Sequence, residues 1–167
     1  MYIFGGCDIL EGQNSSLWAF DLENIGDLSS VEHTKDEENM HNLNWRKVET
    51  SGKDQPSNVS HHQSVVVGHK MYLFGGNFSS FRSACWVLDL DSFKWEVMKG
   101  KENPGAARDE HTVSLVGDMV IIFGGFLNGS RTNTVETFSL KSQQWEKVLC
   151  KASEAPSPRA GHSAVVN

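Results

Sequence analysis

The sequence is poor in the features that mark many chemically specialised proteins. Its 167 residues include only three cysteines, Cys7, Cys85 and Cys150, and their odd number and spacing fit neither a disulfide framework nor a zinc site. Lys and Arg total 15 against 21 Asp and Glu, a net charge of −6, which argues against nonspecific nucleic-acid binding. No apolar run reaches transmembrane length, and the N-terminus lacks the basic region and long apolar stretch of a signal peptide.

These absences predict a protein of the cytoplasm or the nucleus with reduced thiols. The Asn-x-Ser triplets would accept glycans only in a secreted chain, so we interpret their asparagines as turn residues. They are Asn14, Asn58, Asn77 and Asn128. A hydrophobic content of 38% and a charged content of 22% predict one modest globular domain rather than global disorder.

What the sequence does contain is a repeated motif, an apolar run of four residues that ends in two glycines. It occurs at residues 1–6 (MYIFGG), 71–76 (MYLFGG) and 120–125 (VIIFGG). A short apolar run bounded by glycine predicts a strand that is buried on both faces. The glycines predict positive φ angles or a close approach of neighbouring backbone. They are Gly5, Gly6, Gly75, Gly76, Gly124 and Gly125.

Tryptophans and histidines recur with about the same spacing as this motif. Tryptophans recur 50 residues apart at Trp45, Trp95 and Trp145. Histidines follow them after 17, 16 and 17 residues, at His62, His111 and His162. A period of about 50 residues with several strands in each unit is typical of kelch repeats, whereas WD40 units are shorter and carry Trp-Asp. Here Arg or Glu follows each repeated tryptophan, which argues against the WD40 pattern.

The third unit shows the motif most fully, with the apolar run and Gly-Gly at 120–125, a second strand at 135–138, Trp145, and then Pro-x-x-Arg-x-x-His at 156–162. The chain therefore resembles the kelch-repeat β-propeller family, the fold of the central domain of galactose oxidase, over essentially its whole length. The resemblance implies an all-β, kelch-type β-propeller. We expect about three four-stranded antiparallel blades, which is a partial ring.

Strands of a kelch blade are named A to D from the ring centre to the rim. We expect strands B to D of blade 1 within 2–48, with an acidic, disordered insert at 23–43. Blade 2 is predicted at 61–98 and blade 3 at 110–148. In each of them a two-residue hairpin turn is expected between strands A and B. Residues 162–167 read as a further strand A with no blade behind it.

Three blades leave two apolar blade faces without a neighbour, because propellers close with about four to eight blades. Three explanations stay open at this point. The chain is a fragment of a larger kelch protein, which we favour, or it forms a six-bladed ring with a second copy, or it docks on another chain. On the first explanation, missing blades complete the ring.

The resemblance implies that partners bind the ring face that carries the D–A and B–C loops, since function sits on loops of a rigid scaffold. Arginines occupy equivalent positions there and suit an acidic or phosphorylated peptide. They are Arg82 and Arg131 in B–C loops, and Arg108 and Arg159 in D–A loops. For Arg108 and Arg159 we favour the alternative that they stitch neighbouring blades together.

Aromatic and amide side chains share the same loops and are further candidates for partner contact, or for packing between adjacent loops. They are Phe78, Phe81, Phe126, Asn77 and Asn128. The formal charges of these loops cancel, so only local arginine clusters would attract an acidic ligand.

Some propellers of this fold are metal-dependent oxidases or lyases. The oxidases need a Tyr, His and Tyr–Cys set that the two tyrosines here do not supply. The lyase pattern Glu-x-x-x-Asp-x-x-x-His starts at Glu32 and Asp36, but Met40 holds the histidine position. The three repeated histidines are better interpreted as structural. The sequence thus predicts a non-catalytic protein-interaction scaffold or substrate adaptor without a cofactor or metal, and a metal-dependent enzyme is the alternative.

Overall fold

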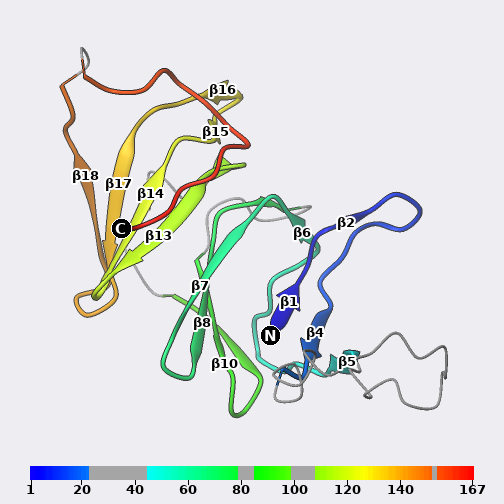
Figure 1. Cartoon of the computed structure of the whole chain (residues 1–167). Helices are drawn as coiled ribbons and strands as arrows, with labels where there is room; N and C mark the ends of the chain where they lie inside the picture. Colours follow the sequence, from blue (N-terminus) through cyan, green and yellow to red (C-terminus); the bar gives the residue numbers. More distant parts are fainter. Residues whose placement is uncertain (23–44, 79–84, 99–107, 152–153) are drawn as a thin grey trace, which may run out of the picture.

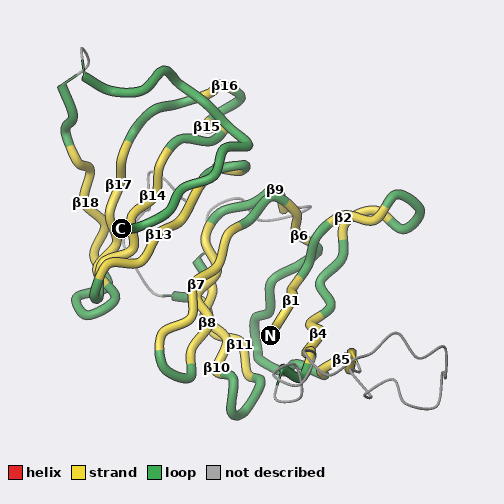
Figure 2. The backbone as a smooth tube through the Cα atoms, in the orientation of Figure 1, coloured by secondary structure: helices red, strands yellow, loops and turns green. Residues whose placement is uncertain are grey.

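A computed structural model describes residues 1–22, 45–78, 85–98, 108–151 and 154–167. Every regular element in these ranges is a β-strand, so the described part of the chain is all-β (Figures 1 and 2). None of it forms a helix long and apolar enough to cross a bilayer.

The main strands form three antiparallel sheets, which are the blades and which follow one another along the chain (Figure 1). Blade 1 has the order β1 (Tyr2–Phe4), β4 (Leu17–Phe20) and β5 (Trp45–Val48). Blade 2 has the order β7 (Gln63–Val67), β8 (Lys70–Phe74), β10 (Trp86–Asp89) and β11 (Lys94–Val97). Blade 3 has the order β13 (Thr112–Val116), β14 (Met119–Phe123), β17 (Val135–Ser139) and β18 (Gln144–Val148). The predicted fold, a partial propeller of antiparallel blades, is confirmed.

The hairpins between strands A and B turn within two residues, as predicted. Val67 pairs with Lys70 and Val116 pairs with Met119, which leaves Gly68-His69 and Gly117-Asp118 as the turns. Gly68 and Gly117 have φ angles of 57° and 60° at the first turn position, a conformation for which glycine carries no steric penalty.

Short paired strands lie at one end of the blades (Figure 1). β2 (Cys7–Asp8) pairs with β3 (Gly12–Gln13), and β6 (Val59–Ser60) pairs with β9 (Asn77–Phe78). β12 (Arg108–Asp109), β15 (Phe126–Leu127) and β16 (Ser130–Arg131) form a third small sheet. D–A segments thus pair with the B–C loop of the blade that they enter, and the two loop types form one continuous surface.

Two details differ from expectation. The structure assigns no strand to residues 162–167, because a strand needs a hydrogen-bonded neighbour and none of the described strands pairs with this segment. β1 also has only one fully buried side chain, Phe4, whereas burial on both faces was expected. The predicted insert at 23–43 lies outside the described residues.

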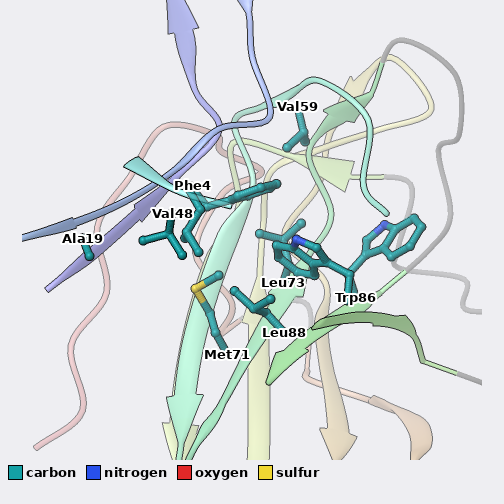
Figure 3. Packing of buried hydrophobic residues seen from close by; sticks show 10 residues of the cluster. Phe4, Ala19, Val48, Val59, Met71, Leu73, Trp86 and Leu88 are labelled. Atoms are coloured by element: carbon teal, nitrogen blue, oxygen red, sulfur yellow. The ribbon is translucent and has the colours of Figure 1, made fainter. Parts of the chain in front are cut away.

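The core lies between blades rather than inside one of them. One cluster joins Phe4, Leu17, Ala19 and Val48 of blade 1 to the face of blade 2 that carries Met71, Leu73, Trp86 and Leu88. Figure 3 shows Phe4 and Val48 lying toward Leu73 and Met71 across this junction. A second cluster joins the opposite face of blade 2, through Phe74 and Cys85, to Val120, Ile122 and Phe138 of blade 3. Blade 2, which lies between the other two, is therefore apolar on both faces.

The Gly-Gly pair after strand B of blade 2 lies where the neighbouring backbone approaches closely. Gly75 and Gly76 have φ angles of 59° and 104°. A Cβ on Gly75 would lie 2.5 Å from Cε1 of His111, and one on Gly76 would lie 2.8 Å from Cβ of His62. The amide of Gly76 donates a hydrogen bond to the carbonyl of Arg108 at 2.8 Å. The first glycine thus touches the segment that enters the next blade, and the second touches the segment that enters its own, so neither position has room for a side chain.

Candidate partner-binding face

The face formed by the D–A and B–C loops holds the residues that the sequence proposed for partner binding. The structure separates them into buried, exposed and undescribed groups. Arg82 and Phe81 lie outside the described residues, and only the backbone of Phe78 is described, in β9. The remaining candidates are Asn77, Arg108, Phe126, Asn128, Arg131 and Arg159.

Arg108 is an interior residue, with 1% of its surface exposed. Its Nη2 lies 2.8 Å from Oε1 of Glu136, which is also buried, and donates to Oγ1 of Thr134 at 3.2 Å. Its Nη1 donates to the carbonyl of Gly124 at 3.1 Å. Burial lowers the pKa of Arg108 and the charge of Glu136 opposes that shift, so the guanidinium remains protonated.

This geometry removes Arg108 from the residues that are able to meet a partner. Its side chain binds strands of blade 3, while its carbonyl accepts the hydrogen bond from Gly76 of blade 2. The physical reason is that Gly124, Thr134 and Glu136 surround the guanidinium and leave it almost no exposed surface. The side-chain contacts all lie within blade 3, and only the backbone carbonyl of Arg108 joins two blades, so the interpretation that the arginine side chain stitches blades together stays a prediction.

Arg159 occupies the equivalent position but is exposed. Its Nε donates to the carbonyl of Ser157 at 3.0 Å and its Nη2 donates to the hydroxyl of the same serine at 3.1 Å. Its backbone carbonyl accepts from the amide of Gly125 at 2.8 Å, as Arg108 does from Gly76. The two arginines therefore share a backbone role and differ in what surrounds the guanidinium.

Arg131 and Phe126 lie together at the tip of blade 3. They face each other across the β15–β16 hairpin, and the guanidinium carbon of Arg131 is 5.0 Å from the centroid of the Phe126 ring. Asn128 and Gly129 form the turn of that hairpin with φ angles of 53° and 80°, the left-handed conformation that Asn-Gly adopts readily. The hairpin presents one cation on an aromatic platform, a cation–π arrangement.

A hollow of about 460 Å³ opens between the loops of blades 2 and 3. It is lined by His61, Gly76, Asn77, Asp109, Glu110, Phe126, Asn128 and Gly129. Three predicted residues, Asn77, Phe126 and Asn128, thus lie around one cavity, and D–A and B–C loops of two blades contribute to it. Its volume is within the range of small-ligand or single-side-chain pockets. Its two carboxylates make it more acidic than the arginine positions suggested.

His61, Asp109 and Glu110 were not predicted. His61 and Glu110 precede the repeated histidine and have positive φ angles of 58° and 53°, and Gly161 at the third equivalent position has 66°. The amide of Glu110 donates to the carbonyl of His61 at 3.1 Å, and the amide of Gly161 donates to the carbonyl of Glu110 at 2.9 Å. These two backbone hydrogen bonds hold the segments that contain His61 and Glu110 in place beside the hollow. The glycine at 161 was the only signal for it in the sequence.

The repeated histidines are packing elements of the junctions. The His111 ring lies against Gly75, and its pKa is lowered to about 3 because burial disfavours the imidazolium and Arg108 repels it. Burial also lowers the pKa of His62, and the His162 ring packs edge-on against Phe123. Among the described residues, no group of three or more His, Cys, Asp or Glu side chains is placed to hold a metal ion.

The comparison with protein families decides what these features belong to. Residues 26–167 match the family described as the KLHDC2/KLHL20/DRC7 Kelch-repeats domain. The chain belongs to the kelch-repeat family. Since the match covers most of the chain, the repeat units read from the glycines, tryptophans and histidines are kelch units.

Curated relatives are longer kelch proteins. The chain is 29% identical over 150 residues to acyl-CoA-binding domain-containing protein 5 of Arabidopsis thaliana, covering 83% of this chain and 23% of that protein. It is 32% identical over 115 residues to human host cell factor 2, covering 58% and 14%. It is 26% identical over 177 aligned positions to kelch domain-containing protein 3 of Bos taurus, covering 98% and 41%. The chain thus spans less than half the length of each.

Proposed function

We propose that the protein is a non-catalytic interaction scaffold or adaptor that binds a protein or peptide segment on its D–A/B–C loop face. The observation that carries this proposal is the hollow between blades 2 and 3, bordered by the Phe126–Arg131 pair. The packed junction between the blades holds the short, paired loops in place. Loops held by a rigid scaffold commonly carry binding residues. An aromatic ring beside a concave site is a suitable anchor for a partner side chain.

The chemistry of the partner is the finer part of the proposal. Arg131 and Arg159 are exposed cations and support an acidic or phosphorylated segment at the rim. Asp109 and Glu110 line the hollow itself, which favours a neutral or cationic side chain there. We therefore propose that a segment with acidic residues contacts the two arginines and inserts an uncharged or basic residue into the hollow. The expected setting is the cytoplasm or the nucleus, and fluorescent tagging of the full-length protein tests it.

Selection from a library of random dodecapeptides, with and without phosphoserine, tests the binding face. Selected peptides are expected to lose about tenfold in affinity for Phe126→Ala, the loss of a modest aromatic anchor. Lys141→Gln is the matched control for Arg131→Gln, since it removes one exposed positive charge in the C–D turn of the same blade, on the opposite face.

The outcomes separate the two levels of the proposal. Peptides that weaken with Phe126→Ala but not with Arg131→Gln retain the binding face and reject the acidic preference. Peptides that bind both variants and the parent equally, or no selected peptides at all, reject the binding face. We propose separately that missing blades or a second chain complete the ring.

A further inference from the structure

Two residues that line the hollow between blades 2 and 3 have a backbone conformation that suits glycine. His61 and Glu110 have φ angles of 58° and 53°, whereas the equivalent position of the third unit carries Gly161, with a φ of 66°. A side chain in this left-handed region costs free energy that glycine avoids. Because both side chains line the same hollow, the unfavourable conformation is kept at two positions around one cavity. Backbone strain of this kind is common at binding sites.

The imidazole of His61 is held by a contact that reaches a neighbouring blade. Its Nδ1 lies 3.0 Å from Oγ of Ser60, which is 3% exposed. The same Oγ accepts a hydrogen bond from Nε2 of Gln13 at 2.8 Å, and Gln13 belongs to β3 of the first unit. The ring is therefore supported on its Nδ1 side, while His61 as a whole is exposed. A flat ring that is already held in place is a suitable wall for a partner side chain.

Glu110 supplies a negative charge to the lining of the hollow. It is half-buried, and among the described residues none forms an ion pair with its carboxylate. Its backbone is fixed, because its amide donates to the carbonyl of His61 and its carbonyl accepts from the amide of Gly161. Asp109 also lines the hollow but has a further interaction, so Glu110 is the carboxylate that a partner is expected to meet. A half-buried carboxylate without a cation attracts a positive charge.

Phe126 adds an aromatic ring to the same lining. Arg131 packs on this ring, 5.0 Å from its centroid, but is not among the residues that line the hollow. A volume of about 460 Å³ is thus bordered by an aromatic ring, an imidazole and a carboxylate. Lysine and arginine fit this combination, because their aliphatic stems pack on rings while their charged ends pair with a carboxylate. An apolar side chain would leave Glu110 without a partner, and an acidic one would be repelled.

We propose that the hollow binds a basic side chain of the partner, a lysine or an arginine, with its charge at Glu110 and its stem packed on His61 and Phe126. The proposal rests on the proposed binding face and makes its chemistry specific, since uncharged and basic residues were both open there. His61 and Glu110 are then specificity-determining residues, which explains why the chain carries them where glycine fits the backbone better.

Peptides from the dodecapeptide selection test the charge at Glu110. We expect a lysine or an arginine at one position of the selected peptides, and its replacement by norleucine is expected to lower affinity for the parent protein about tenfold. With Glu110→Gln the same replacement is expected to have little effect, because the partner of the charge is gone. Asp118→Asn is the matched control. It removes an exposed carboxylate from the A–B turn of blade 3, at the opposite end, and is expected to preserve the tenfold difference.

A glycine variant separates binding from folding. Glu110→Gly removes the carboxylate together with the unfavourable side chain, so peptide affinity is expected to fall about tenfold. The midpoint of thermal unfolding is expected to stay the same or to rise by about 2–4 °C, since glycine adopts this conformation readily. Gln143→Gly is the matched control, with a φ of 55° in the C–D turn of blade 3, and is expected to leave affinity unchanged. A purely structural role for Glu110 predicts a lower midpoint with unchanged affinity.

A small probe tests the hollow without a selected peptide. Nα-acetylarginine amide is added to the full chain, and the amide signals of Gly76 and Gly129, which line the hollow, are followed by NMR. Nα-acetylcitrulline amide is the control, because it has nearly the same shape without the charge. We expect the arginine derivative to bind about tenfold more tightly, and Glu110→Gln to remove that difference. Nα-acetyl-lysine amide, in a parallel titration, shows whether an ammonium fits as well as a guanidinium.

Equal binding of the arginine and citrulline derivatives, or a difference that Glu110→Gln leaves intact, overturns the proposal. Selected peptides that bind Glu110→Gln and the parent alike overturn it too. If those peptides still weaken with Phe126→Ala, the binding face stands and only the basic occupant is rejected. If no peptide is selected but the arginine derivative binds through Glu110, the basic site stands and the peptide-binding face fails.

Discussion

Arg108 and Glu136 form a buried ion pair, with Nη2 of the arginine 2.8 Å from Oε1 of the glutamate. The equivalent residues at the junction of blades 1 and 2 are Val59 and Trp86, which are 0% and 6% exposed. The same pair of positions is therefore filled by an ion pair in blade 3 and by two apolar side chains in blade 2. The position requires two matched side chains rather than an arginine as such.

That equivalence predicts the behaviour of substitutions at the pair. Arg108→Val alone is expected to lower the free energy of unfolding by about 3–5 kcal/mol, because the Glu136 carboxylate is left buried without its partner. The double variant Arg108→Val with Glu136→Trp, which copies the other junction, is expected to recover most of that loss. Urea unfolding of the parent, both single variants and the double variant checks this. Additive losses in the double variant would show that the two positions are not coupled.

Gly75 and Gly117 separate two reasons for a glycine. Both have φ near 60°, but a Cβ on Gly117 meets nothing within 4 Å, whereas one on Gly75 would collide with the segment that carries His111. Gly117→Ala is expected to cost about 1 kcal/mol from backbone strain alone. Gly75→Ala is expected to cost about 1–3 kcal/mol more, since the neighbouring blade has to move. Thermal unfolding of the two variants measures the difference, and equal losses would contradict the close-approach argument.

His111 makes stability depend on pH. Its pKa is lowered to about 3 in the folded protein, below the ordinary value of 6.5, because it is buried and lies near Arg108. Above pH 6.5 the histidine is neutral in both states and its contribution is fully present. As the pH falls from 6.5 toward 3, the unfolded chain gains a proton that the folded protein does not, so the free energy of unfolding falls by about 1.4 kcal/mol per pH unit.

Unfolding titrations between pH 6.5 and pH 4 on the parent and on His111→Gln measure this effect. In the glutamine variant, the slope of the free energy of unfolding against pH is expected to be smaller by the contribution of one proton, about 1.4 kcal/mol per pH unit. This holds whatever the absolute stability of the variant. A slope equal to that of the parent would show that His111 is not responsible. His62, whose pKa burial also lowers, is expected to sustain part of the remaining slope.

The local features of this protein were readable from the sequence. The spacing of the Gly-Gly pairs, tryptophans and histidines predicted the repeat, its strands and the two-residue turns at Gly68 and Gly117, because backbone conformation and strand burial are encoded within a few residues. The order of the loops predicted that D–A and B–C loops share one end of the blades, whereas the choice of that end as the binding face was implied by the kelch resemblance and stays a prediction.

The fate of individual side chains depended on the tertiary structure. Arg108 and Arg159 have the same place in the motif, yet one is buried beside Glu136 and the other is exposed next to Ser157. The hollow also joins His61 to Asp109 and Glu110, residues nearly one repeat apart, through a backbone relay that composition did not signal. The motif determines where the chain runs in each blade, whereas the neighbouring blade determines which side chains meet water, because the core lies between blades.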